Sequence, residues 1–301
     1  MEHSLHRWSE KYVSISRIIA LFARSLLCAD RLPCNNPGDY RSVRDWTVWK
    51  YYKKFFPINL VKTVDLSPDK TYLFGSHPHG ILCSGAFCCF GTEAAGFSKI
   101  FPGLTARLLT LKGQFMIPGY RDLFLSTGAC AATKEGMEAL LEEPKGTAAV
   151  LVPGGALEAI NSDPDKIRLV LNRRKGFIKL ALRYGVDLVP TFSFGEAFVY
   201  DQVKSEKGGW LWAFQTLAER WVGFVPVIFL GRGIFQYNFG LLPKRQKITV
   251  VVGKPLEVVK TLDPTRDQIA ELHEKYVKAL TDLYNDYNPV YGDTNISLVI
   301  E

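Results

Sequence analysis

The stretch Thr71-Tyr-Leu-Phe-Gly-Ser-His-Pro-His-Gly80-Ile-Leu-Cys-Ser-Gly85 sets the expected fold, because a strand signal within it runs directly into two histidines. Loops that leave the carboxyl ends of parallel strands converge on ligands in α/β proteins. The imidazole is the side chain best suited to proton transfer near neutral pH. Proline fixes φ between the two histidines, and Gly80 allows a turn or the close approach of a substrate. We therefore expect either a catalytic loop at a strand end or a turn whose histidines happen to be exposed.

The composition is that of a folded globular protein, with 47% hydrophobic and 22% charged residues among 301. This length suits one large α/β domain or two small ones. Aromatic residues make up 13% of the chain. That content suits an apolar ligand cavity, a membrane-facing surface or a well-filled core.

The net charge of +7 and the pI near 9.0 favour an anionic partner. A phosphorylated co-substrate, anionic lipid headgroups and nucleic acid all fit this charge. We expect no nucleic-acid partner, because the chain contains no helix-turn-helix, zinc-finger or RNA-binding signature. The six cysteines show no paired C-x-x-C spacing, so we expect free thiols in a reducing compartment.

Residues 1–45 are expected to form an N-terminal extension, and residues 46–301 the main domain. The run 13–28 is apolar but contains Arg17 and Arg24. A membrane-spanning helix needs roughly 20 predominantly apolar residues. We therefore expect an amphipathic helix that lies on a membrane or packs on the domain. The segment 46–56 is helical, aromatic on one face and basic on the other, which suits an interfacial segment or a helix packed on the core.

Further along the chain, strand and helix signals alternate. Strands are expected at 147–152, 186–194, 225–230 and 247–252, and helices at 81–97, 117–127, 134–143, 175–185, 209–221 and 264–286. This alternation predicts an α/β fold with a mostly parallel central sheet and helices on both faces.

The two histidines favour direct general-base chemistry over other uses of imidazole. A metal centre normally needs three or more protein ligands, and the remaining histidines lie in terminal segments, so we expect no metal. No Gly-x-Ser-x-Gly motif is present. A base that acts on a substrate hydroxyl is therefore favoured, with a Cys83–His79 pair as the alternative.

Two further segments carry candidate binding groups. Pro153-Gly154-Gly155 follows a buried strand and can present backbone N–H groups to an oxyanion or phosphate, although ordinary turns use the same residues. Glu158, just beyond it, can orient a histidine or face solvent. The run Asn172-Arg-Arg-Lys-Gly176 is basic and suits phosphate groups or a solvated helix face. Arg232 is equally ambiguous.

Five motifs in this order resemble the diacylglycerol acyltransferase type 2 family, which includes monoacylglycerol and wax-alcohol acyltransferases. They are His77-Pro-His-Gly80, Val152-Pro-Gly-Gly-Ala-Leu-Glu158, Arg174-Lys-Gly-Phe-Ile-Lys-Leu-Ala-Leu-Arg183, Ser193-Phe-Gly-Glu196 and Gly231-Arg-Gly-Ile-Phe235. The resemblance covers about residues 43–290 and is closest to the monoacylglycerol branch. It implies a glycerolipid-acyltransferase-like fold.

The resemblance also implies acyl transfer from acyl-coenzyme A, as co-substrate and without a resident cofactor, to the hydroxyl of a mono- or diacylglycerol in triacylglycerol synthesis. The alternatives are wax-ester synthesis with a long-chain alcohol, or a non-catalytic lipid-binding protein. The implied location is the cytosolic face of the endoplasmic reticulum membrane or the lipid-droplet surface. A homo-oligomer is compatible with these expectations.

The expected site joins the motifs to that chemistry. His79, with His77, would take the proton of the acceptor hydroxyl, and Glu93, Glu158 or Glu196 would orient the histidine. The expected substrate-binding residues are Pro78, Gly80, Gly154, Gly155, Arg173, Arg174, Lys175 and Arg232. Backbone amides near Gly80 or Gly154 would stabilise the oxyanion, the basic run would bind coenzyme A phosphates, and residues 81–91 would line the acyl channel.

Overall fold

The computed structural model describes residues 41–155, 158, 166–202, 209, 217, 229–233 and 240–301. The predicted extension at 1–45 therefore lies almost entirely outside the described residues, and so does the predicted helix at 209–221. Only the short helix α2 (Arg41–Arg44) belongs to the described part of that extension.

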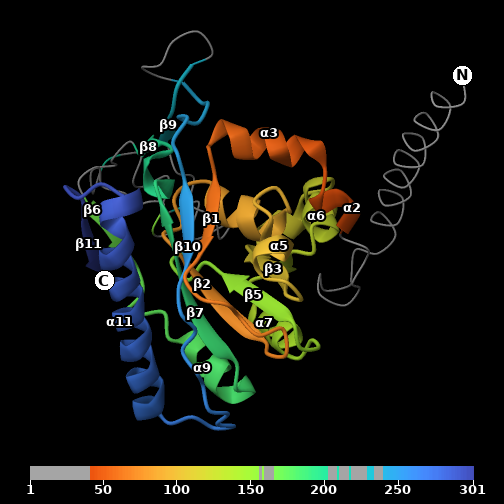
Figure 1. Ribbon diagram of the computed structural model, residues 1–301, viewed down its shortest axis with the longest axis vertical. Coiled ribbons are helices and arrows are strands. Elements are labelled where there is room, and N and C mark those ends of the chain that lie inside the picture. The colour runs from red at the N-terminus through yellow and green to blue at the C-terminus, as the bar shows by residue number, and fades with distance from the viewer. Residues whose placement is uncertain are drawn as a thin grey trace, which may run out of the picture.

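A seven-stranded sheet forms the centre of the molecule, with the strand order β1-β10-β7-β2-β5-β3-β4 (Figure 1). Its strands are β1 (Asn59–Lys62), β2 (Tyr72–His77), β3 (Thr105–Thr110), β4 (Cys130–Ala131), β5 (Thr147–Leu151), β7 (Asp187–Phe194) and β10 (Thr249–Val252). β2 pairs in parallel with both β5 and β7. β10 is antiparallel to β7 and carries β1 beside it. The prediction of a mostly parallel sheet is confirmed.

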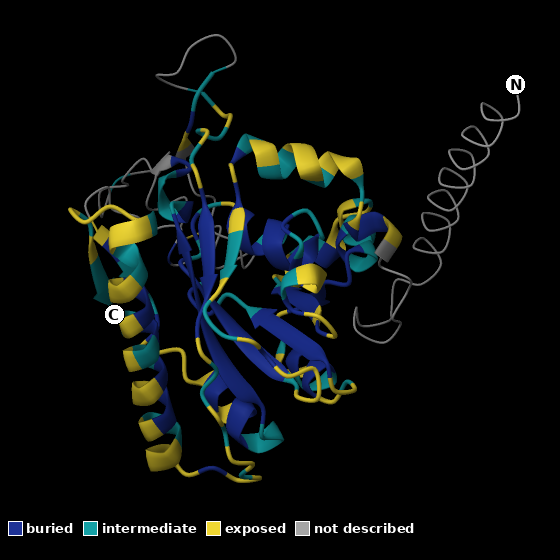
Figure 2. Ribbon diagram, viewed as in Figure 1, coloured by how far each residue is buried: buried dark blue, intermediate teal, exposed yellow. Residues whose placement is uncertain are grey.

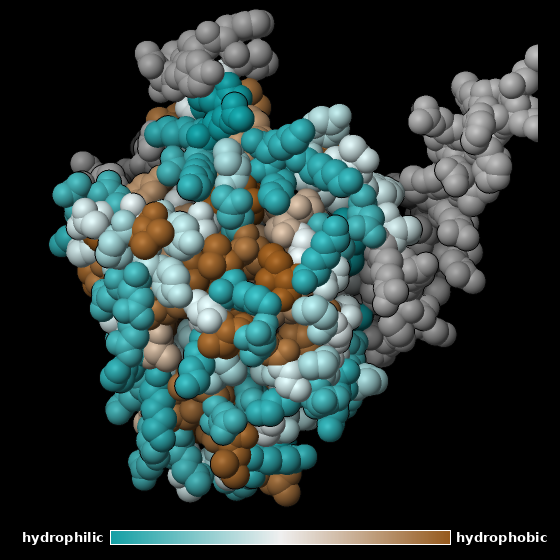
Figure 3. Space-filling view, viewed as in Figure 1, coloured by the Kyte–Doolittle hydropathy of each residue, from teal (hydrophilic) through white to brown (hydrophobic). Residues whose placement is uncertain are grey.

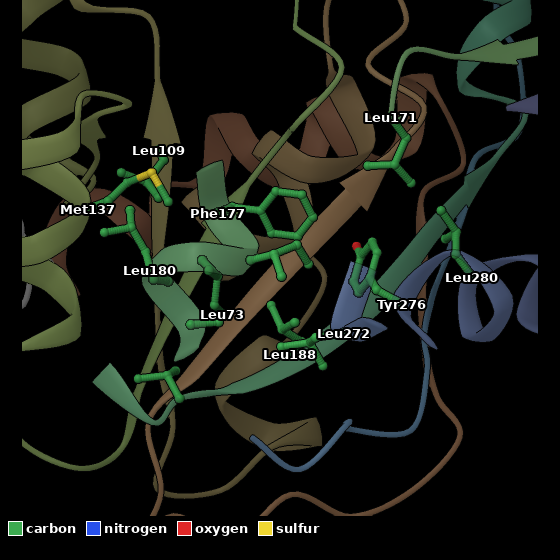
Figure 4. Close-up of a cluster of buried hydrophobic side chains, with 14 of the residues drawn as sticks. Leu73, Leu109, Met137, Leu171, Phe177, Leu180, Leu188, Leu272, Tyr276 and Leu280 are labelled. Atoms are coloured by element: carbon green, nitrogen blue, oxygen red, sulfur yellow. The ribbon is translucent and has the colours of Figure 1, made fainter. Parts of the chain in front are cut away.

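Helices cover both faces of the sheet, as predicted. On one face lie α7 (Lys134–Leu141), α9 (Gly176–Tyr184) and α11 (Arg266–Tyr291), which share a buried apolar cluster with the strands (Figure 4). On the other face lie α4 (Ser84–Ala86), the π-helical turn η1 (Phe87–Gly91) and α5 (Phe97–Ile100), in a second cluster rich in phenylalanine. The inner strands β2, β7 and β10 are completely buried, whereas β1 at the sheet edge is partly exposed (Figure 2).

α3 (Thr47–Phe55) occupies the predicted helical segment 46–56 and packs on the domain. Its Trp49 and Tyr52 rings lie edge-on to Phe87, with centroid distances of 5.3 and 6.0 Å. Trp49, Tyr52 and Phe55 are thus partly covered by the domain, while Lys50, Tyr51 and Lys54 are exposed. Packing on the domain is thus observed for this helix, and the interfacial segment stays a prediction, since Val48 and Tyr51 are exposed.

The remaining elements connect or flank these layers. They are η2 (Lys112–Met116) and α6 (Tyr120–Ser126) after β3, η3 (Glu196–Phe198) after β7, the antiparallel pair β8 (Asp201–Gln202) and β9 (Phe229–Leu230), and the parallel pair β6 (Lys166–Leu169) and β11 (Ser297–Ile300). The predicted strand at 225–230 is described only over β9.

Within the described residues, no helix has the length and apolar character needed to cross a membrane. On the face seen in Figure 3, hydrophobic side chains are concentrated in the middle of the view and are surrounded by hydrophilic ones.

Candidate active site

The two sequence-predicted histidines lie at the carboxyl end of β2, the middle strand of the sheet. His77 is the last residue of the strand, opposite Phe192 of β7. His79 lies two residues further, in the loop that leads to α4. Because β5 and β7 run parallel to β2, the segments that follow them, with Gly154, Glu158 and Glu196, reach the same edge of the sheet. The sheet thus brings most of the predicted motifs to one place.

His77 is completely buried, and its ring contacts the C-terminal helix. Its Nε2 lies 3.1 Å from the hydroxyl oxygen of Tyr276 in α11. Burial lowers the pKa of His77 to about 3. The ring is therefore uncharged near neutral pH.

His79 is half-buried and has one ring nitrogen engaged. Its Nδ1 lies 2.7 Å from the carbonyl oxygen of Gly80, and since a carbonyl only accepts, Nδ1 carries the proton. Nε2 of the neutral ring then carries a lone pair. Burial lowers the pKa of His79, and the hydrogen bond to the Gly80 carbonyl opposes this shift. The His79 ring is thus held in its neutral form, with the Nε2 lone pair as the group that can accept a proton.

Glu158 binds the backbone of the histidine loop. Its carboxylate accepts the His79 N–H at 2.8 Å through one oxygen and the Val170 N–H at 3.0 Å through the other. A Cβ at Gly154 would overlap this carboxylate, so the glycine makes room for it. Burial raises the pKa of Glu158 to about 7, and the two N–H donors and the charge of Arg174 oppose the shift.

Glu196 holds the other end of the same loop. Its two oxygens accept the N–H groups of Ser84 and Gly85, each at 2.7 Å. The carboxyl group is only 2% exposed, and its burial raises the pKa to about 7. Glu196 also packs closely against Gly80. A Cβ at this position would lie only 2.8 Å from Glu196 Cγ, so a larger residue would collide with the glutamate.

Both carboxylates thus act on the loop backbone, whereas the sequence interpretation has a carboxylate orienting an imidazole ring. Among the described residues, the ring partners are the Gly80 carbonyl and the Tyr276 hydroxyl. Glu93, the third candidate, is not brought to the histidines. It forms an ion pair with Arg44 at 3.2 Å and accepts a hydrogen bond from Ser98.

The Cys–His alternative is disfavoured by the surroundings of Cys83. Burial raises the pKa of this thiol well above its ordinary value, so it stays protonated. The nucleophile in a cysteine enzyme is the thiolate. Within the described part of the chain, no group of three or more histidine, cysteine and acidic side chains gathers as a metal site would require.

The basic candidates fall in two places. Arg173, Arg174 and Lys175 are exposed in the loop between β6 and α9, and Arg174 is close enough to Glu158 to affect its pKa. Arg232 lies elsewhere: its Nε donates to the Pro243 carbonyl at 3.3 Å, and its guanidinium lies 5.5 Å from the ring centroid of Phe55. The structure thus brings the first group near the site and gives Arg232 separate partners.

Pro78 links the two histidines, and Gly155 ends the turn after β5 with φ at +59°. A Cβ at Gly155 would meet no atom of the described residues within 4 Å. The sequence interpretation missed Tyr276. The available signal was Gly75 in the middle of an apolar strand, since such a glycine often marks the close approach of another group.

Comparisons with known proteins agree on one family. A family model described as diacylglycerol acyltransferase matches residues 12–301. The chain is 46% identical over 264 residues to diacylglycerol O-acyltransferase 2 of Danio rerio, covering 86% of this chain and 73% of that protein. It is 44% identical over 251 residues to 2-acylglycerol O-acyltransferase 1 of Bos taurus, covering 83% and 75%. It is 41% identical over 281 residues to diacylglycerol O-acyltransferase 2A of Umbelopsis ramanniana, covering 92% and 79%.

A comparison with solved structures finds a protein of much lower sequence identity. The 1-acyl-sn-glycerophosphate acyltransferase PlsC of Thermotoga maritima superposes with a TM-score of 0.43 and 14% sequence identity, over 87% of this chain and 86% of that one.

Proposed function

The chain belongs to the diacylglycerol acyltransferase family, and we propose that it transfers a fatty acyl group from acyl-coenzyme A to the hydroxyl of a mono- or diacylglycerol. The observation that carries this proposal is the arrangement of His79. Its Nδ1 proton is bound by the Gly80 carbonyl and its backbone N–H by Glu158, so Nε2, which has no hydrogen-bond partner among the described residues, can accept a proton.

In the proposed reaction, His79 Nε2 takes the proton of the acceptor hydroxyl while the hydroxyl oxygen attacks the thioester carbonyl carbon. The tetrahedral intermediate then collapses, the carbon–sulfur bond breaks, and the coenzyme A thiolate takes the proton from His79. The products are an ester and free coenzyme A, and no resident cofactor is used. His79 is preferred to His77 because burial lowers the pKa of His77 to about 3, too low for an effective base at neutral pH.

Backbone amides of the turns at Gly80 and at Gly154–Gly155 are the proposed donors to the oxyanion. Both turns follow strands that end at the same edge of the sheet, and no described residue would lie within 4 Å of a Cβ at Gly155. One such donor contributes about 2.7–4 kcal/mol in a measured case. The exposed Arg173, Arg174 and Lys175 are the proposed partners of the coenzyme A phosphates, since guanidinium and ammonium groups bind phosphate oxygens well.

We further propose that the enzyme works at the cytosolic face of the endoplasmic reticulum membrane or on lipid droplets, with the segment 111–120 against the lipid. Four large apolar side chains of this segment are exposed: Leu111, Met116, Ile117 and Tyr120. The segment follows β3, which runs parallel to β5 and therefore ends at the same edge as the histidine loop. Apolar side chains exposed at the edge that holds the site suit a lipid surface and a lipid substrate.

An acceptor panel tests the proposed reaction. Full-length protein is incubated with labelled acyl-coenzyme A and, in turn, monoacylglycerol, diacylglycerol and a long-chain alcohol. We expect labelled di- or triacylglycerol. Labelled wax ester alone would contradict the glyceride acceptor, and the absence of product with every acceptor would favour a non-catalytic lipid-binding protein.

A further inference from the structure

Tyr276 joins the C-terminal helix to the end of the central strand. It lies within α11, is completely buried, and its hydroxyl is 3.2 Å from the Gly75 carbonyl oxygen and 3.1 Å from His77 Nε2. In Figure 4 its ring extends from α11 into the apolar cluster, near Phe177 of α9. The two rings meet edge to face with centroids 5.2 Å apart. One phenol thus connects three elements of this face.

Gly75 is the residue that admits this hydroxyl. A Cβ at position 75 would overlap Tyr276 Oη. A glycine inside a strand costs stability, because it has more freedom to lose on folding and no side chain to pack. Here the missing side chain leaves the space in which the phenol reaches both the strand carbonyl and the imidazole. The contact between Gly75 and Tyr276, which are 201 positions apart, therefore requires a glycine at position 75.

The hydrogen-bond roles at this contact follow from the proton count. A carbonyl oxygen only accepts, so the single hydroxyl proton of Tyr276 goes to Gly75, and the phenol oxygen accepts from His77 Nε2–H. His77 Nδ1 then carries a lone pair, and it has no hydrogen-bond partner among the described residues. The opposite tautomer would leave a buried N–H donor unpaired, at a cost of about 1–3 kcal/mol.

We infer that Tyr276 is a positioning residue: it fixes His77 as the neutral Nε2–H tautomer and anchors the strand end from which His79 projects. The tautomer assignment depends only on the structure. Its consequence for catalysis rests on the proposed acyl transfer, because His79 is separated from His77 by a single proline. A shift of the strand end displaces the base relative to the substrate hydroxyl, and misplacements of about 1 Å cost roughly 100-fold in rate.

Nitrogen-15 NMR of histidine-labelled full-length protein tests the tautomer directly, with the His77 signals assigned by their loss in His77→Gln. We expect a neutral Nε2–H ring that does not titrate between about pH 6 and pH 8, where an ordinary histidine does. A Tyr276→Phe protein should show a larger share of the Nδ1–H form. A titrating His77, or the Nδ1–H form in the wild-type protein, would overturn the inference.

Steady-state kinetics test whether Tyr276 affects the rate of acyl transfer, with Tyr284→Phe as the matched control. Tyr284 is also buried in α11, and its hydroxyl donates to the Ile296 carbonyl at 2.7 Å. We expect Tyr276→Phe to lower kcat at least tenfold with the KM for acyl-coenzyme A unchanged, and Tyr284→Phe to change neither. Equal kcat values in the two variants would refute the positioning role. If the wild-type protein transfers no acyl group, the proposed function fails while the tautomer result still stands.

Discussion

Two buried glutamates hold the loop that carries the proposed base. Glu158 binds the backbone of His79, and Glu196 binds the backbone of Ser84 and Gly85. Both have a pKa of about 7, above the ordinary 4.5, because they are removed from water. Folding therefore favours their protonated forms. The stability that this contributes is fully present below about pH 4.5 and is lost as the pH rises through about 7.

We predict that Glu196→Gln weakens this pH dependence. A pKa rise from 4.5 to about 7 corresponds to at most about 3 kcal/mol. The free energy of unfolding of the wild-type protein should therefore fall between about pH 5 and pH 8, and that of the variant should fall less. Glu274→Gln, on the exposed face of α11, is the control. It should show the same change of unfolding free energy with pH as the wild-type protein. Denaturant titrations at about pH 5 and pH 8 measure the free energy of unfolding. An equal change between the two pH values in the wild-type protein, Glu196→Gln and Glu274→Gln would contradict the raised pKa of Glu196.

At the scale of elements, the turn after β5 is built around one glycine. We predict that Gly154→Ala displaces the Glu158 carboxylate, because the added Cβ would overlap it. The expected result is a loss of at least about 1 kcal/mol of stability together with a loss of acyl transfer. Gly176→Ala is the control, since a Cβ there meets no atom of the described residues within 4 Å. Thermal unfolding measures the stability, and an activity assay measures acyl transfer. Equal stability and equal activity of the two variants would show that the turn tolerates a side chain at position 154.

The loop between β6 and α9 supports a second prediction at this scale. Arg173→Gln with Lys175→Gln should raise the KM for acyl-coenzyme A severalfold and leave the KM for the glyceride nearly unchanged, because two of the charges proposed to bind the phosphates are lost. The control is Lys275→Gln with Lys278→Gln, two exposed lysines of α11 paired with Glu271 and Asp282. If the control raises the KM equally, the effect comes from net charge and not from this loop.

At the scale of the whole molecule, the sheet separates an edge with the site from an edge without it. Met116 and Ile117 follow β3 at the site edge and are 77% and 56% exposed. Val259 and Leu262 are 81% and 76% exposed at the opposite edge, where the Val258 N–H binds Asp187 at the start of β7. The two pairs are similar in exposure and differ in position.

We predict that Met116→Asp with Ile117→Asp reduces binding to phospholipid vesicles at least several-fold, because charged side chains resist transfer into lipid. Val259→Asp with Leu262→Asp should bind like the wild-type protein. Co-sedimentation of the full-length proteins with vesicles measures both. Weaker binding by the second pair alone would place the lipid at the other edge.

The sequence was sufficient for the elements whose signals are local. Apolar runs predicted β2, β5 and β7, and the helix predicted at 264–286 is observed as α11, which Thr265 caps at its N-terminus. The two-residue strand β4 and the pairing of β6 with β11 gave no such signal. The histidine loop was predicted, and Glu158 and Glu196 were among the predicted partners of the histidine ring. Their binding to the loop backbone and the contact with Tyr276 were not predicted, because these contacts span 79 to 199 positions and depend on packing.

The central claim is that His79 is the base of an acyl transfer, and the most direct measurement is the kcat of His79→Gln with labelled acyl-coenzyme A and the preferred glyceride. General-base catalysis contributes about 100- to 10,000-fold, so we predict a loss of at least about 100-fold in a protein whose folding is verified by circular dichroism. The residual rate should not rise with pH, whereas the wild-type rate should rise up to the lowered pKa of His79 and then level off. A folded His79→Gln protein with wild-type kcat would contradict the account.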